Sequence, residues 1–257
     1  MSDYHAQTRS DAIGREGAAI DPGLRRFMLG VYMKMGLGLA WSAALAYVIG
    51  TVAPVTQFVL SPPVVYIVMY GPLVVLLGSN FFMRNPSPAA SGVLFWTVVT
   101  LMGAGLSFWV IVAANSLAVP TIGGGSMSIS FATMAKAFLV TTAAFGGLAL
   151  WGYTTKKNLS GLHSLVFMAS WGLAAIGLLN VFVFKSGAMD IGLQVVTLGV
   201  FSVLVATQTN QLRETYFHIA HDERSQAVMT NMGALNLYIA FVAIFQTLLR
   251  LMGSSRS

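Results

Sequence analysis

The sequence has few charged residues and no cysteine. Only 9% of its 257 residues are charged, whereas a soluble protein carries roughly a quarter. Hydrophobic residues make up 56%, and the mean hydropathy is +0.75. The absence of cysteine excludes disulfides, thiolate catalysis and cysteine-ligated metal sites. This composition indicates an integral membrane protein.

Acidic residues are missing from most of the chain. No Asp or Glu occurs between Asp21 and Asp190, and the later acids Glu214, Asp222 and Glu223 fall in one polar segment. Proton relays and cation sites inside membranes usually use carboxylates, whose burial is otherwise too costly. Calcium prefers about six to eight oxygen ligands, typically with carboxylates among them. Calcium binding is therefore conceivable but has no carboxylate support.

What the sequence does have is a series of long apolar runs. Each is close to the roughly 20 residues that cross about 30 Å of hydrocarbon as a helix, and all are too continuous for barrel strands. The expected spans are Phe27–Val52, Val64–Met83, Ala89–Ala113, Phe131–Tyr153, Leu162–Phe184, Ile191–Gln211 and Met232–Met252. The sequence predicts an all-α, seven-helix transmembrane domain at 27–253.

The segments outside this domain are short and polar. Residues 1–26 lack an apolar segment of the signal-peptide kind, and we expect a cytoplasmic N-terminal tail there. Residues 254–257 form a short C-terminal tail. The segment "GGGS" at 123–126 predicts a flexible outer loop rather than a phosphate-binding nest.

Basic residues alternate between the loops, which fixes an orientation. They concentrate in the tail, after the second span, after the fourth and after the sixth: Arg25, Arg26, Arg84, Lys156, Lys157, Arg213 and Arg224. The positive-inside rule then places the N-terminus in the cytoplasm and the C-terminus outside a bacterial inner membrane. The same rule accounts for the net charge of +6, so no nucleic-acid partner is expected. We expect Lys34 and Lys136, inside spans, to reach the nearer surface with their amines.

Enzymatic chemistry has little support in the residues. Ser107 in "GLSF" lacks the second glycine of a serine-hydrolase turn. His218 and His221, beside Asp222, allow a metal site, but a solvated juxtamembrane turn is the simpler interpretation. We therefore expect a protein that is not an enzyme and has no cofactor or resident metal.

Small and polar residues follow helical spacing in the last two spans. In the seventh they are Gly233, Asn236, Ala240, Ala243, Thr247 and Arg250, and in the sixth Gly199, Ser202, Ala206, Asn210 and Arg213. Such stripes allow close packing of helices in membranes. They also allow a thin wet crevice, and both interpretations stay open at this point.

Two segments carry a resemblance to a known family. "GYTTKKNLSGL" (152–162) and "MGALNLYIAFVAIFQTLLRLMG" (232–253) resemble the bacterial branch of the Bax inhibitor-1 family. The resemblance extends over nearly all of the chain after residue 26. It implies a seven-helix membrane bundle, a link to pH-sensitive calcium leak and, in other bacterial members, a role as modulators of a membrane-bound protease.

The resemblance also implies where an ion site would lie. The family's pair of buried aspartates matches Ala206 and Ala240 here, and its basic partner matches Arg84. Alanines neither titrate nor coordinate ions. The candidate polar seam that remains consists of Ser202, Thr207, Gln208, Asn210, Asn236 and Thr247.

Two functions follow from these observations. The first is a non-enzymatic membrane protein that binds or regulates another membrane protein, in quality control or in a larger complex. The alternative is a pH-sensitive cation leak channel that uses amide, hydroxyl and carbonyl oxygens in place of carboxylates.

Overall fold

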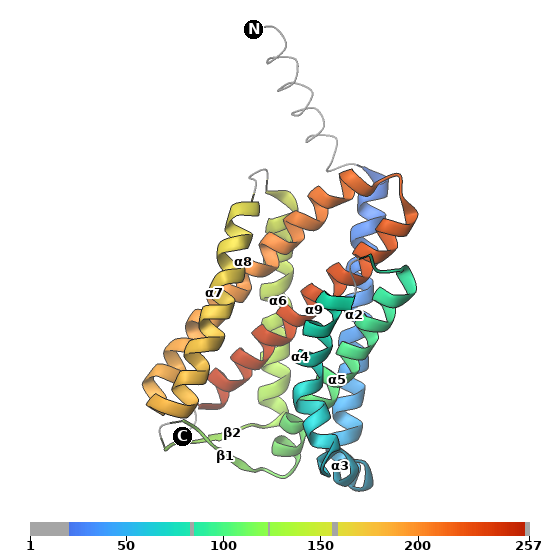
Figure 1. The fold of residues 1–257 in the computed structure, drawn as a ribbon. Helices are drawn as coiled ribbons and strands as arrows, with labels where there is room; N and C mark the ends of the chain where they lie inside the picture. The colour runs from blue at the N-terminus through green and yellow to red at the C-terminus, as the bar shows by residue number, and fades with distance from the viewer. Residues whose placement is uncertain (1–20, 83–84, 123, 156–158, 255–257) are drawn as a thin grey trace, which may run out of the picture.

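The fold is a helical bundle with one small hairpin, seen in a computed structural model that describes residues 21–82, 85–122, 124–155 and 159–254. The helices are α2 (Pro22–Thr51), α3 (Ala53–Leu60), α4 (Val64–Phe82), α5 (Pro88–Ala114), α6 (Phe131–Thr154), α7 (Ser160–Leu179), α8 (Gly187–Ile219) and α9 (Glu223–Ser254). Strands β1 (Ala118–Pro120) and β2 (Ser126–Ser128) pair antiparallel. We call the two ends of the bundle the N-terminal end, where α2 begins, and the hairpin end (Figure 1).

Helix α9 forms the centre of the bundle. It packs against α2, α5, α6 and α8, and 67% of its most apolar window is buried. Tyr238 and Leu237 are fully buried on it, next to Phe95 of α5 and Val31 of α2. The helix with the polar stripe is therefore an inner helix of the protein, surrounded by other helices instead of lipid.

The predicted membrane spans are confirmed, with one qualification about their number. Six described helices are long and apolar enough to cross a membrane, and a seventh span arises if α3 and α4 are taken together across a 67° bend. The bend falls at Pro62 and Pro63. Proline lacks an amide donor and disfavours helical geometry in the residue before it, so the helix is interrupted there.

The first helix begins earlier than the sequence predicts. Helix α2 starts at Pro22, so five residues of the predicted tail at 1–26 belong to it. Asp21 is the N-cap and accepts a hydrogen bond from the Gly23 amide at 2.8 Å. Proline is favoured at the first helical position because its missing amide would be unpaired anyway.

The predicted polar loop between the last two spans is nearly absent. Helix α8 continues to Ile219 and α9 begins at Glu223, well beyond the predicted limits of Gln211 and Met232. Hydropathy detects only the apolar part of such helices. Asp222 starts α9, because its carboxylate accepts from the Arg224 amide at 3.0 Å and from the Ser225 hydroxyl.

Two further connections depart from the predictions. The flexible loop expected at 123–126 overlaps the β1–β2 hairpin. Ser126 already belongs to β2, and Val119 of β1 pairs with Met127. Between α7 and α8, a five-residue π-helical segment (Asn180–Phe184) ends in a tight turn. Asn180 is buried there and exchanges two hydrogen bonds of 3.1 Å with the Ser186 backbone.

Candidate functional site

The two alanines that match the family's aspartates lie inside the bundle. Ala206 of α8 and Ala240 of α9 are both 0% exposed. Neither residue lines the cavities described below. Their surroundings are helix contacts rather than an open chamber.

Helix α8 approaches α6 closely at Ala206. A Cβ atom placed on Gly152 would lie 2.3 Å from the Ala206 carbonyl oxygen, so only glycine fits at this point. One helical turn further, Asn210 donates to the Gly152 carbonyl at 3.3 Å, and Arg213 donates to the Tyr153 carbonyl at 2.6 Å. The stripe of α8 therefore packs against the end of α6 at Ala206, Asn210 and Arg213, and α8 packs against α9 as well.

Two amide side chains of the polar seam keep an unpaired oxygen. The Oε1 of Gln208 and the Oδ1 of Asn210 are buried and have no hydrogen-bond partner in the described part of the chain. Gln208 also lines a small crevice of about 140 Å³ between α8 and α9, together with Gln211, Thr215 and Asn236. The structure thus brings Gln208 and Asn236 together.

The other predicted site residues lie elsewhere. Thr207 and Thr247 are buried, and each hydroxyl donates to a carbonyl of its own helix, Leu204 at 3.0 Å and Ala243 at 2.8 Å. Ser202 is half-buried and lies about one turn before Ala206 on α8. Arg84 lies outside the described residues, so its place in the site stays a prediction.

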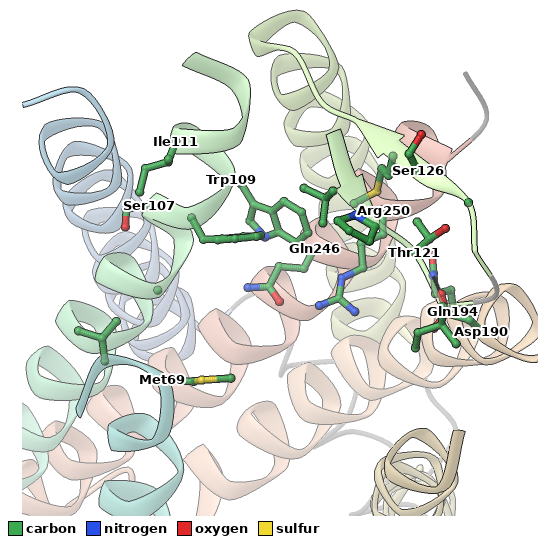
Figure 2. Close-up of a pocket in the computed structure, with 18 of the residues that line it drawn as sticks. Met69, Ser107, Trp109, Ile111, Thr121, Ser126, Asp190, Gln194, Gln246 and Arg250 are labelled. Atoms are coloured by element: carbon green, nitrogen blue, oxygen red, sulfur yellow. Dashed lines mark hydrogen bonds between the residues drawn. The ribbon is translucent and has the colours of Figure 1, made fainter. Parts of the chain in front are cut away.

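A larger cavity, of about 750 Å³, lies at the hairpin end (Figure 2). Its walls come from α3, α4, α5, the hairpin, the first turns of α8 and the last part of α9. Four of its residues are polar or charged on α8 and α9: Asp190, Gln194, Gln246 and Arg250. A third hollow of about 700 Å³ lies between α2 and α6 and includes Asp21, Arg25, Tyr32 and Tyr153.

Comparisons with known proteins agree on one family. The model of the family described as "Inhibitor of apoptosis-promoting Bax1" matches residues 24–257. This chain belongs to the Bax inhibitor-1 family. A Caulobacter vibrioides protein is 39% identical over the full length of both chains. The inner membrane protein YbhL of Escherichia coli is 30% identical, over 96% of this chain and 98% of its own. A membrane protein of Streptococcus pyogenes is 27% identical over 98% of this chain.

Two buried polar networks of this Bax inhibitor-1 family member were missed by the sequence analysis. In the first, the Ser42 hydroxyl of α2 lies 2.7 Å from the Tyr238 hydroxyl of α9 and donates to the Val99 carbonyl of α5 at 3.1 Å. These groups are buried in the core. The network joins three helices whose residues are far apart in the sequence, so no local pattern predicts it.

The second network involves Lys34, whose side chain is half-buried. Its amine donates to the Oδ1 of Asn231 on α9, a partner that the sequence did not predict. It also lies 5.3 Å from the centre of the Phe95 ring. Asn231 in turn donates to Ser91 at 2.8 Å and to the Pro88 carbonyl at 3.0 Å. Lys136, by contrast, is exposed.

The histidine pair that allowed a metal site is solvent-exposed. His218 lies in the last turn of α8, and His221 lies in the short connection to α9. Among the described residues, no three His, Cys, Asp or Glu side chains gather closely enough to hold a metal ion.

Proposed function

We propose that this protein is a non-enzymatic membrane protein that binds or regulates another membrane protein. The observation that carries the proposal is the outer surface of α7 and α8. Only 11% of the most apolar window of each helix is buried, compared with 67% for α9. These two helices therefore present a broad apolar face to the surroundings of the bundle.

That face contains glycines that pack against none of the other described residues. A Cβ atom placed on Gly172 or Gly177 of α7, or on Gly192 or Gly199 of α8, would meet no atom of the described part of the chain within 4 Å. In membranes, small residues at a helix surface let another helix approach closely and gain van der Waals contacts. Lipid chains need no such gaps, so a partner helix is the better explanation.

The interior supports the same proposal. Ala206 and Ala240 are buried in helix contacts, and the contact of Ala206 with Gly152 holds α6 against α8. This is the environment of packing residues. Regulation through a surface fits this interior better than ion chemistry at a buried acid pair.

The orientation belongs to the proposal as well. The described N-terminal end carries Arg25, Arg26, Arg213 and Arg224, which favours this end in the cytoplasm. The E. coli relative is named an inner membrane protein. We place this chain in the same membrane, with its hairpin end outside.

The test uses glycines as matched sites. The full-length protein is expressed in its native host with Gly172→Leu or Gly177→Leu, and with Gly146→Leu on α6 as control, since a Cβ at each of the three positions meets no described residue within 4 Å. Partners are captured by crosslinking in intact membranes. We expect the α7 variants to lose specific partners that the α6 control keeps. Identical partner sets for all variants, or a protein that always emerges alone, would contradict the proposal.

A pH-sensitive cation leak is the second candidate, favoured by the unpaired oxygens of Gln208 and Asn210. Amide oxygens can replace part of the hydration shell of a cation. The protein is placed in liposomes with a calcium dye at several pH values. A leak that bulky substitution at Ala206 or Ala240 abolishes would support this candidate and weaken the first one. Ala206→Asp with Ala240→Asp then tests whether these positions match the family's aspartates, because an acid-sensitive response is expected if they do.

A further inference from the structure

The cavity at the hairpin end combines two unlike walls. One wall is apolar and comes from α4 and α5, with Val65, Val68 and Met69 on the first and Phe108 and Ile111 on the second. The other wall carries the polar groups of α8 and α9. Its volume of about 750 Å³ lies within the range of about 300–1,000 Å³ typical of ligand sites.

The polar wall presents opposite charges that do not neutralise each other. Asp190 and Arg250 line the same cavity, and neither forms an ion pair with another of the described residues. The Asp190 carboxylate instead accepts from the Gln194 side-chain amide at 2.7 Å. The Arg250 guanidinium lies 5.7 Å from the centre of the Trp109 ring. In Figure 2 it projects into the cavity beside Gln246, with Asp190 and Gln194 across from it.

The acceptors on the Asp190 side are also incompletely used. The Oε1 of Gln194 is buried and has no hydrogen-bond partner among the described residues. Asp190 stands in the first turn of α8, which stabilises its carboxylate through the helix dipole. The helix start explains why a carboxylate is tolerated here, but it leaves the free amide oxygen unexplained.

The level of these groups in the bundle matters for the choice of ligand. Helix α8 begins and α9 ends at the hairpin end, so Asp190 and Arg250 both lie near that surface of the membrane. Lipid headgroups lie at this level, whereas the apolar wall of α4 continues toward the hydrocarbon. Met69 and Ile191, at the cavity, are 68% and 51% exposed.

We propose that this cavity binds a zwitterionic phospholipid with a primary ammonium group, such as a phosphatidylethanolamine. The phosphate lies at the Arg250 guanidinium, which offers paired donors suited to phosphate oxygens. The ammonium donates to the Asp190 carboxylate and to the Oε1 of Gln194. The first part of an acyl chain lies along Val65, Met69 and Phe108.

The phosphate position at Arg250 and the ammonium position at Asp190 and Gln194 together disfavour the other common phospholipids. A phosphatidylglycerol offers the phosphate but no cation for Asp190. A phosphatidylcholine offers a cation, but its quaternary ammonium has no N–H to donate to Gln194 or Asp190. A hydrogen bond to a charged group contributes enough that its loss weakens binding by about tenfold or more.

The test measures lipid retention by native mass spectrometry. Purified full-length protein is incubated with an equimolar mixture of phosphatidylethanolamine, phosphatidylcholine and phosphatidylglycerol that share the same acyl chains. We expect about tenfold higher occupancy by the ethanolamine lipid than by either of the others. A separate sample receives phosphoethanolamine alone, which should bind far more weakly because the apolar wall stays empty.

Variants assign the contacts. Arg250→Gln should lower occupancy by all three lipids, because each carries a phosphate. Asp190→Asn and Gln194→Leu should remove the preference for the ethanolamine lipid over the choline and glycerol lipids. Arg224→Gln and Glu223→Gln, at the opposite end of the bundle, are the matched controls. The melting temperature of each lipid-free variant shows whether it folds, and Gln194→Leu gives a second reading if Asp190→Asn unfolds.

Several outcomes would overturn the proposal. These are equal occupancy by the three lipids, unchanged selectivity in folded Asp190→Asn or Gln194→Leu, and equal loss in the variants at the opposite end. Binding of phosphoethanolamine as strong as that of the lipid would also overturn it, because the ligand would then be a soluble zwitterion. None of these outcomes depends on the proposed partner, which is tested on α7.

Discussion

Replacing Gly152 by alanine should separate α6 from α8. The new Cβ would lie 2.3 Å from the Ala206 carbonyl oxygen and 2.9 Å from its Cα. An ordinary carbon–oxygen contact is about 3.3 Å or longer, so the helices must move apart by about 1 Å. No flexible side chain can absorb this movement, because the opposing atoms are backbone.

The same movement breaks two hydrogen bonds. The Asn210 bond to the Gly152 carbonyl is already 3.3 Å long, and the Arg213 bond to the Tyr153 carbonyl, now 2.6 Å, also lengthens beyond good geometry. Overpacking costs about 1–3 kcal/mol, and each lost hydrogen bond about 1 kcal/mol. We expect Gly152→Ala to lower the free energy of unfolding by about 3–5 kcal/mol.

The assay is unfolding of purified protein in mixed micelles with rising SDS, followed by circular dichroism. Gly146→Ala is the matched control, because Gly146 lies on the same helix and its new Cβ would meet none of the described residues within 4 Å. The control should unfold like the wild type or slightly later, since alanine favours helices over glycine. Equal stability of the two variants would refute the reasoning that Ala206 sits in an obligatory α6–α8 contact.

Three further outcomes test the polar groups. Tyr238→Phe should cost about 1 kcal/mol of unfolding free energy in the same SDS assay, because Ser42 keeps its other acceptor. Asn231→Leu should cost about 2–3 kcal/mol because the Lys34 amine loses its acceptor, and adding Lys34→Met should restore part of this. The Ser225 hydroxyl, followed by backbone amides, holds the pKa of Asp222 below its ordinary 3.8. This capping contribution is present above pH 3.8 and is lost as pH falls through the lowered pKa. Amide exchange in the first turn of α9 should therefore rise only below about pH 4. The Asp222→Asn variant should show no such rise.

Much of the fold was predictable because the membrane imposes a simple constraint. A span must be a helix of about 20 apolar residues, so hydropathy locates the centres of α5, α6 and α9 well. It says little about helix ends, which depend on capping groups such as Asp21 and Asp222. Strands of three residues, as in the hairpin, are too short to leave a periodic pattern.

The candidate site was predictable only in part. The stripe of α8 was visible at helical spacing, but its partner was not, because contact between Gly152 and Ala206 depends on how three helices pack. The cavity at the hairpin end could not be predicted at all. In the sequence, Asp190 and Arg250 are isolated charges near the ends of different spans, and only the fold places them on one wall.

The hydrogen bonds of the seam indicate which of its residues matter for function. Thr207 and Thr247 satisfy their hydroxyls within their own helices, so their presence requires no partner or ligand. Gln208 and Asn210 do not, since each keeps a buried oxygen without a donor, and such groups are costly to bury. A polar function of the seam, whether it involves water, a cation or a partner's donor, therefore depends on these two amides, and Gln208 is the one that also reaches the crevice beside Asn236.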